Sequence, residues 1–304
     1  MSGLAFRPSS GSRRSCSPNT HFSVPMRLDK RLAAVTALGM DGTKLIDLDR
    51  SGIQWRLDPR LRADQQTGEM VYAGNDIDRG HLVRRASAVW GDTLEEAARA
   101  NADTFHYTNA APQAAKFNQG MDLWLGLESC LQDNAADNSR RLVVFTGPIF
   151  GDTDPVYRGV QIPLKFFKAA AFMHHGSLAA TGYVVDQTPQ LADLPDVPRP
   201  GALDEAPPLG PFRTFQVPIR DIAVLTGLDL EPAPRRSNST ASLTLRRPAS
   251  IAGEAADDVE CCLWSTGFYS PTSAPLSARR CSPSRRSSPL GQPTGRRGWP
   301  SAHC

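Results

Sequence analysis

The sequence predicts a mixed α+β domain with a mixed or antiparallel sheet as its core. Short apolar runs of strand length recur along the chain, and only a few segments show helical periodicity. Turn residues such as Asp41-Gly42 separate the apolar runs. The patterned part of the chain is about 210 residues long, which is the length of one domain. Several strands accompanied by few helices are typical of an α+β architecture.

Composition divides the 304-residue chain into three parts. Residues 1–19 are rich in Ser, Arg, Pro and Gly, so we expect a disordered segment. Residues 20–231 contain the patterned runs and are predicted to form the domain. Residues 232–304 repeat Arg-Arg pairs among Ser, Pro, Ala and Cys, which predicts a disordered, low-complexity tail. A shifted reading frame would give a tail of the same composition, and resequencing the gene would test that hypothesis. The alternative is a genuine basic tail that binds phosphates.

The basic charge lies at the two ends of the chain. The overall net charge is +3, yet residues 1–20 hold three arginines and no acid. Ten arginines stand against four acids in residues 233–304, so the central part is net acidic. A nucleic-acid surface on that part must therefore be a local patch.

Cysteine and hydropathy patterns exclude several classes of protein. Five of the six cysteines lie near the ends, so they form neither a disulfide framework nor a paired zinc-binding spacing. No apolar run approaches about 20 residues, and we expect no membrane partner. The N-terminus lacks the apolar stretch of a secretory signal. The compartment stays open between secreted or periplasmic and cytoplasmic.

The first half of the domain is predicted to contain three strands and one helix. Alternation predicts strands over 22–24 and 31–38, and a polar loop over 51–70. A short strand broken at Gly80 is expected over 77–83. The capping-box pattern that begins at Thr93 predicts a helix to about residue 101.

The second half of the domain continues with strands around one longer helix. A strand is predicted over 104–108, and an apolar stripe predicts a helix over 120–134. The remaining expected elements are strands over 142–146, within 160–172, over 182–185 and over 215–218, a long loop over 187–211, and a short helix over 219–225.

Chemistry-bearing residues cluster in three stretches. They are Asp78-Arg79-Gly80-His81, then Asn109-Ala110-Ala111-Pro112-Gln113, then Asn118-Gln119-Gly120 with Glu128 further on. Phosphodiester hydrolysis needs a base for the attacking water, and histidine suits that role at neutral pH. It also needs a cation for the developing charge, and Mg²⁺ prefers oxygen ligands such as an amide. An arginine can fork onto a phosphate oxygen.

These stretches, in this order, resemble the DNA/RNA non-specific endonuclease family of ββα-metal (His-Me finger) nucleases. Residues 145–150 and 163–168 resemble further core strands of that family. The resemblance covers roughly residues 20–231 and leaves both ends uncovered. It implies a sequence-non-specific endonuclease that hydrolyses DNA and RNA, with a ββα-metal unit as its active site.

The resemblance also implies roles for particular residues. His81 would be the general base, and Asn118 the protein ligand of Mg²⁺, with Mn²⁺ or another divalent metal as alternatives. Arg79 would contact phosphate, Asn109 would help to position the site, and Glu128 would hold metal-bound water. Substrate contacts are further predicted for Arg84, Arg85 and Arg60; Arg56 and Arg62 are the other candidates for an upstream family arginine.

One spacing departs from the family pattern. Asn118 and Glu128 are ten residues apart, two more than in well-known members. Ten residues of continuous helix rise about 15 Å, too far for both side chains to touch one ion. A helix that starts after Gly120 would shorten the span and leave Glu128 to act through water. Asp122 is the alternative acid.

Other classes of function remain as competitors at this stage. A nucleic-acid-binding module without catalysis would bind DNA but not cut it, and a truncated or frameshifted nuclease would be unstable. A zinc hydrolase is disfavoured because histidine and cysteine ligands do not cluster. The resemblance leaves a homodimer and an inhibitor protein open as partners.

Overall fold

The structure is a computed structural model, and it describes residues 16–50, 52–198, 214–228 and 230. The tail predicted over 232–304 and residues 1–15 of the segment predicted over 1–19 lie outside these residues, so their disorder stays a prediction. For residues 16–18 the prediction is wrong, because they form a strand that pairs with residues 23–25.

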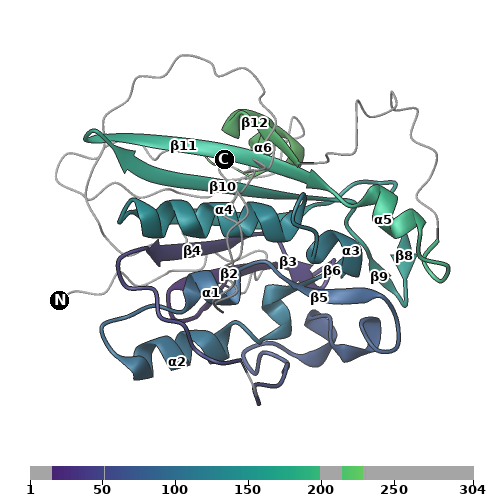
Figure 1. The fold of residues 1–304 in the computed structure, drawn as a ribbon. Helices are drawn as coiled ribbons and strands as arrows, with labels where there is room; N and C mark the ends of the chain where they lie inside the picture. The colour runs from purple at the N-terminus through teal and green to yellow at the C-terminus, as the bar shows by residue number, and fades with distance from the viewer. Residues whose placement is uncertain (1–15, 51, 199–213, 229, 231–304) are drawn as a thin grey trace, which may run out of the picture.

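An eight-stranded antiparallel sheet forms the centre of the domain, which confirms the mixed α+β class (Figure 1). Its order is β1 (Cys16–Pro18), β2 (Phe22–Arg27), β4 (Thr36–Asp41), β7 (Arg141–Ile149), β10 (Lys165–His174), β11 (Ser177–Asp186) and β12 (Thr214–Val217), with β3 (Leu32–Ala33) paired to β2. The strands β10 and β11 form a long hairpin, in register from Lys165 opposite Asp186 to His174 opposite Ser177.

Side chains on the central strands alternate between two hydrophobic clusters, one on each face of the sheet. On β10, Phe166 and Ala170 belong to the larger cluster, and Phe167 and Ala169 belong to the smaller one. This period of two is what a strand buried on both faces requires. Lys168 shares the face of Phe166 and Ala170, so a charged side chain stands on the side of the larger core.

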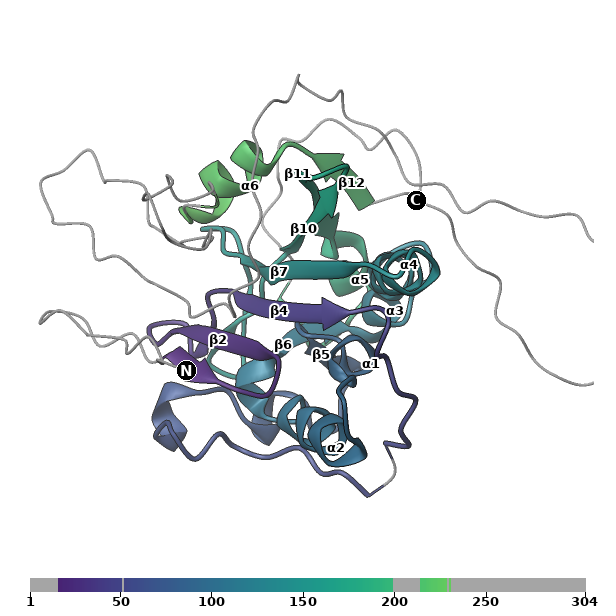
Figure 2. The ribbon, with the colours of Figure 1, turned by 90° about the vertical axis from the view of Figure 1, so that its left-hand side faces the viewer.

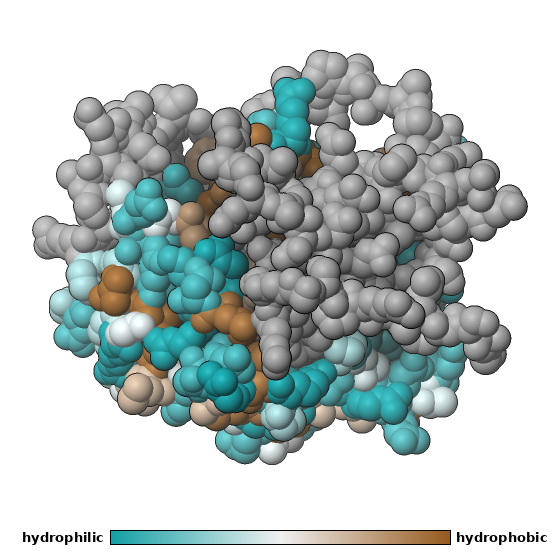
Figure 3. Space-filling model, turned by 180° about the vertical axis from the view of Figure 1, so that it is seen from behind, coloured by the Kyte–Doolittle hydropathy of each residue, from teal (hydrophilic) through white to brown (hydrophobic). Residues whose placement is uncertain are grey.

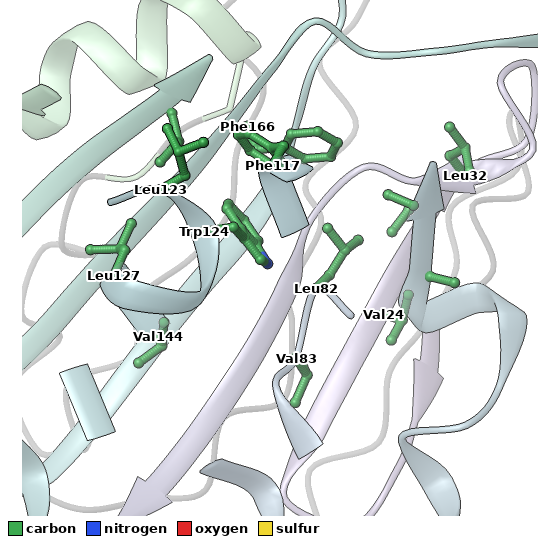
Figure 4. Close-up of a cluster of buried hydrophobic side chains, with 14 of the residues drawn as sticks. Val24, Leu32, Leu82, Val83, Phe117, Leu123, Trp124, Leu127, Val144 and Phe166 are labelled. Carbon is green, nitrogen blue, oxygen red and sulfur yellow. The ribbon is translucent and has the colours of Figure 1, made fainter. Parts of the chain in front are cut away.

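Helices cover both faces of the sheet. The helix α4 (Trp124–Asp137) covers the face of the larger cluster, and α6 (Ile219–Thr226) lies on the opposite face (Figure 2). On the α4 side, Trp124 is fully buried and packs against Phe117 and Phe166 (Figure 4). This aromatic group anchors the start of α4 against the sheet.

The motif-bearing stretches form a strand pair followed by helices. The strands β5 (Ile77–His81) and β6 (Ala110–Ala114) make a separate two-stranded sheet, in which His81 lies opposite Ala110. The short helix α3 (Ala115–Asn118) follows β6 directly, and α4 comes after a turn. This order is the ββα unit that the resemblance implies.

Short elements complete the domain. They are three 3₁₀ helices, η1 (Ala63–Gln65), η2 (Glu69–Val71) and η3 (Tyr107–Asn109), the helices α1 (Arg85–Ala88), α2 (Leu94–Asp103) and α5 (Thr188–Ala192), and the hairpin β8 (Val156–Tyr157) with β9 (Val160–Gln161). Seen from behind, the described surface carries hydrophobic side chains in small groups between hydrophilic ones (Figure 3). Among the described residues, no helix is both long and apolar enough to span a bilayer.

Five predicted elements differ from the structure. The strand expected over 104–108 is wrong: Thr104 caps α2, a 3₁₀ turn follows, and the strand begins only at Ala110. The strand expected over 31–38 is split, because β3 pairs with β2 whereas β4 pairs with β2 and β7. The strand at 77–81 runs through Gly80 without a break. The loop expected over 187–211 contains α5.

The fifth difference concerns the start of the long helix. It begins at Trp124 instead of near Gly120, because Gly120–Leu123 form a turn closed by the Leu123 N–H donating to the Gly120 carbonyl at 3.1 Å. A Cβ on Gly126 would lie only 1.7 Å from the carbonyl oxygen of Met121, so this tight approach requires glycine.

Candidate active site

Gly80 allows the strand that carries His81 to pack closely against its neighbour. A Cβ at Gly80 would lie 2.0 Å from the Oε1 atom of Gln113, a fully buried residue on β6. Any side chain there would push β5 away from Gln113. The glycine between Arg79 and His81 is therefore a packing requirement of the strand pair.

His81 lies at the end of β5 in an aromatic surrounding. Its ring centroid is 4.7 Å from that of Trp55 and 5.3 Å from that of Phe105, with the Phe105 ring perpendicular to it. The residue as a whole is half-buried, but the Nε2 atom is enclosed and has no hydrogen-bond partner in the described protein. Nε2 is therefore not engaged by any other group of the described protein.

Burial and charge both keep His81 neutral. Desolvation is the largest cause that lowers the pKa of His81, and the positive charges of Arg50 and Arg85 lower it further, to about 3. The imidazole is therefore neutral at neutral pH, so one of its two nitrogens carries no proton. An anionic substrate phosphate beside it would raise this pKa, which would strengthen the base once substrate is bound.

Asn118 ends α3 beside the strand of His81. Its Nδ2 atom donates to Oδ2 of Asp78 at 2.8 Å, and the Gln119 Nε2 atom donates to the same oxygen at 2.9 Å. Because the amide nitrogen is engaged with Asp78, the Oδ1 oxygen is the atom that Asn118 can offer to a cation. A hard divalent cation prefers such an oxygen, so this donor fits the implied metal.

Asn109 is a fully buried clamp on the chain that leaves His81. Its Oδ1 atom accepts from the Val83 N–H at 2.9 Å, and its Nδ2 atom donates to the carbonyls of Val83 at 3.0 Å and Thr104 at 3.1 Å. Its own carbonyl accepts from the Leu82 N–H at 2.9 Å. Asn109 therefore fixes the two residues that follow His81.

Arg79 shares the face of β5 with His81 and is engaged in an ion pair. Its Nε atom donates to Oε2 of Glu69 at 3.0 Å, and its Nη2 atom contacts both carboxylate oxygens. The Tyr107 hydroxyl donates to the same carboxylate. The guanidinium also lies over the ring of Tyr72, 5.6 Å from its centroid. A substrate phosphate that binds Arg79, as predicted, would therefore have to compete with the Glu69 carboxylate.

Glu128 is buried on α4, where it pairs with a lysine of the sheet. Its Oε1 atom lies 3.1 Å from Nζ of Lys168, and both side chains are nearly inaccessible to solvent. Lys168 also donates to the Leu82 carbonyl at 3.3 Å and to Oγ1 of Thr146 at 3.2 Å. The Lys168 ammonium lies 4.3 Å from the ring centroid of Trp124.

The ion pair of Lys168 and Glu128 is linked by a hydrogen bond to the backbone next to His81. Burial lowers the pKa of Lys168, while the charge of Glu128 works against that shift. Trp124 donates its Nε1 hydrogen to the His81 carbonyl at 3.3 Å. Lys168 and Trp124 therefore hold two successive carbonyls, those of Leu82 and His81, and connect the strand end to the large sheet.

The other predicted arginines have separate surroundings. Arg85 donates to the Leu48 carbonyl at 2.7 Å and is one of the charges that lower the pKa of His81. Arg84 lines a small cavity together with Glu128, and its Nη1 atom is enclosed there without a hydrogen-bond partner. Arg60 forks onto Asp58 through two contacts of 2.7 Å. A substrate contact of Arg60 would have to compete with that buried carboxylate.

Several residues of this region were not predicted from the sequence. They are Arg50, Trp55, Glu69, Tyr107 and Lys168. Lys168 carries a recognisable signal, because a lysine within the apolar run of β10 needs a buried partner. Trp55 and Glu69 lie in the polar stretch 51–70, which has no periodicity that could place them.

Few side chains of this region could serve as oxygen ligands of a divalent metal ion. Asn118 supplies an amide oxygen, and Asp122 lies exposed in the turn before α4. Among residues 16–198 and 214–230, as far as the structure describes them, no three His, Cys, Asp or Glu side chains converge on one point. Mg²⁺ keeps several of its own waters and accepts one or two protein ligands, so the donors present fit such an ion.

Comparison with known proteins assigns the chain to a class of phosphodiester-cleaving proteins. The model of the DNA/RNA non-specific endonuclease family matches residues 4–237. The chain therefore belongs to the DNA/RNA non-specific endonuclease family, a family of divalent-metal-dependent nucleases. This agrees with the resemblance carried by the three motif stretches.

Two individual proteins show how far the similarity reaches. The chain is 36% identical over 249 residues to an uncharacterized protein, y4fB, of Sinorhizobium fredii (strain NBRC 101917 / NGR234), which covers 76% of this chain. The chain spans only 36% of the length of that relative. A crystal structure of the EndoG/EndoGI complex shares the fold with a TM-score of 0.53 at 17% identity, over 70% of this chain and 83% of the solved one.

Proposed function

We propose that this chain is a metal-dependent, sequence-non-specific endonuclease that hydrolyses phosphodiester bonds of DNA and RNA. The observation that carries the proposal is the neutral, half-buried imidazole of His81 on the strand that also holds Asp78, the residue that orients Asn118. A base and an oriented oxygen donor on one strand–strand–helix unit are what metal-assisted hydrolysis by water requires. The family membership supports the same reaction class.

Each residue contributes a defined step in this proposal. His81 accepts the proton of the attacking water, and the clamp of Asn109 keeps the chain after His81 in place. Asn118 would hold the divalent ion, which we propose to be Mg²⁺; when bound, the ion stabilises charge on the phosphate and on the leaving oxygen. Arg50 and Arg85 lie close enough to His81 to influence its charge, and they attract a phosphate to its side of the site.

The substrates follow from how the site makes contact. Arginines and a metal ion bind backbone phosphates, which carry no sequence information. Cleavage is therefore expected to be sequence-blind and to weaken as the salt concentration rises. A homodimer and an inhibitor protein stay proposals; the EndoG/EndoGI structure describes inhibition of EndoG, a protein that shares this fold.

The test is cleavage of plasmid DNA and of RNA by the purified full chain, with Mg²⁺ and with EDTA. The wild type should degrade both polymers only with metal. His81→Ala should lower kcat by about 10²- to 10⁴-fold, the usual contribution of a general base. His174→Ala, in the distant β10–β11 hairpin, is the matched control and should cut like the wild type.

Three results would contradict the proposal or one of its parts. A folded wild type that binds DNA but cuts neither polymer with any divalent metal would leave a nucleic-acid-binding module. Full activity of His81→Ala would remove His81 from its role. Asn118→Ala should raise the metal concentration needed for half-maximal rate, and an unchanged metal requirement would remove Asn118 as the ligand.

A further inference from the structure

Arg79 and Tyr107 together form an anion site that is occupied by a side chain of the protein itself. Arg79 presents its Nε and Nη2 hydrogens, and Tyr107 presents its hydroxyl, to the single carboxylate of Glu69. Three donors that converge on two oxygens of one anion would equally suit two oxygens of a phosphate.

We propose that Glu69 is a displaceable occupant of a phosphate subsite formed by Arg79 and Tyr107, and that substrate must replace its carboxylate. This inference rests on the proposed nuclease function, since it specifies how that site takes up the backbone. It makes Tyr107 a substrate-binding residue and makes Glu69 a residue that limits affinity.

The position of the subsite beside the candidate base supports this inference. Arg79 and His81 are two residues apart on β5, so their side chains share one face about 6.6 Å apart along the strand. The ring of Trp55 bridges the same face, with centroids 4.7 Å from His81 and 5.7 Å from Tyr107. A phosphate held by Arg79 and Tyr107 would therefore lie next to the reaction centre.

The cluster allows Glu69 to leave without a movement of the backbone. Its side chain is 54% exposed, whereas the Arg79 side chain is 31% exposed. The backbone of η2 is held by Arg158, which donates to the carbonyls of Met70 at 2.9 Å and Ala73 at 2.6 Å. Only the flexible side chain of Glu69 needs to rotate into solvent.

The arginine keeps its place when the carboxylate leaves. Its guanidinium rests over the ring of Tyr72, a cation–π contact that does not depend on Glu69. Tyr107 lies nearly parallel to Tyr72, with ring centroids 6.0 Å apart. The donors of the subsite are thus supported from behind, and the occupant is attached only through the donors themselves.

The charge of Glu69 makes it an effective competitor. Hydrogen bonds from Arg79 and then from Tyr107 lower the pKa of Glu69, so its carboxylate is ionised at neutral pH. Exchange of one anion for another at the same donors costs little, because exposed ion pairs are worth little in water. Removing the charge should therefore favour substrate by a small factor.

The experiment measures binding of a fluorescent single-stranded DNA to the full chain, with EDTA present so that cleavage does not interfere. Glu69→Gln should lower Kd by about two- to fivefold, the value of one exposed ion pair. Tyr107→Phe should raise Kd, because it removes one of the three donors. Asp29→Asn is the matched control: it makes the same charge change at another exposed arginine–carboxylate fork, that of Arg27, which is not among the predicted substrate contacts, and it should change Kd far less.

A second comparison assigns the effect to Arg79. In the Arg79→Gln background, Glu69→Gln should no longer tighten binding, because the donor for which Glu69 competes is gone. Weaker binding by Glu69→Gln, or a change equal to that of Asp29→Asn, would overturn the inference and make Glu69 a residue that positions Arg79. Failure of the wild type to cleave would count against the nuclease proposal alone, since these measurements require only binding.

Discussion

Two ion pairs are attached to the chain next to His81, one through Arg79 on β5 and one through the Leu82 carbonyl, and they differ in their exposure to water. Glu69 and Arg79 meet at the surface on β5 and η2, whereas Glu128 and Lys168 meet in the core between α4 and β10. An exposed pair can be exchanged for another anion at small cost, but a buried pair cannot be opened without leaving a charge in a medium of low dielectric constant. The first pair is suited to take part in substrate exchange, and the second is suited to hold the site together.

The largest predicted effect on stability comes from removal of the buried cation, Lys168. Lys168→Met leaves the charge of Glu128 without its partner, and we expect the free energy of unfolding to fall by about 3–5 kcal/mol. Urea denaturation followed by circular dichroism measures this loss. The double variant Lys168→Met with Glu128→Gln removes the second charge and should recover a large part of the stability.

Two outcomes would contradict this view of the buried pair. A loss below about 1 kcal/mol for Lys168→Met would show that the pair behaves like an exposed one. No recovery in the double variant would show that Lys168 acts through Leu82 and Thr146 instead of through Glu128.

The second prediction concerns the titration of the candidate base, His81. In the metal-free protein, burial and the charges of Arg50 and Arg85 lower the pKa of His81 to about 3. Because a lowered pKa keeps the imidazole neutral as the pH falls, His81 should not titrate between pH 8 and pH 5, where an exposed histidine titrates near about 6.5. NMR of histidine-labelled protein measures this, and the spectrum of His81→Ala identifies the resonance.

The same shift constrains the pH dependence of cleavage. Loss of the neutral base with falling pH should begin only below about 6.5 in kcat/KM, which reports the enzyme without substrate. An NMR titration midpoint near that ordinary value would mean that Nε2 is solvated in solution and that the enclosed geometry does not hold.

The sequence predicts the parts of this molecule that depend on local interactions. The helix that begins after Thr93 was expected from its capping-box pattern, and in the structure the Thr93 hydroxyl accepts from the Glu96 N–H. For the long helix, the apolar stripe predicts a start near Gly120, which is too early. The stripe gives no sign of the turn that precedes Trp124. That turn depends on the close approach of Gly126 to Met121, which a periodicity of apolar residues cannot show.

The candidate site divides in the same way. His81 and Asn118 stand in motifs that a reader of the sequence can find. Their partners come from segments without a pattern: Glu69 lies in a polar loop, and Lys168 meets Glu128 from a strand 40 residues further along the chain. Tertiary packing alone brings these charges together, so the spacing of residues could not predict which carboxylate pairs with which cation.

The smallest predicted effect on stability is that of removing the exposed carboxylate, Glu69. Glu69→Gln should change the free energy of unfolding by no more than about 1 kcal/mol, because its ion pair is exposed and screened by water. Urea denaturation of Glu69→Gln and Lys168→Met side by side makes the comparison direct, with Asp29→Asn as the control for the loss of an exposed charge. If Glu69→Gln lowered the free energy of unfolding as much as Lys168→Met does, the fold would depend on the Glu69 carboxylate. A carboxylate that the fold requires could not be displaced by a substrate phosphate, so this result would contradict the proposed subsite.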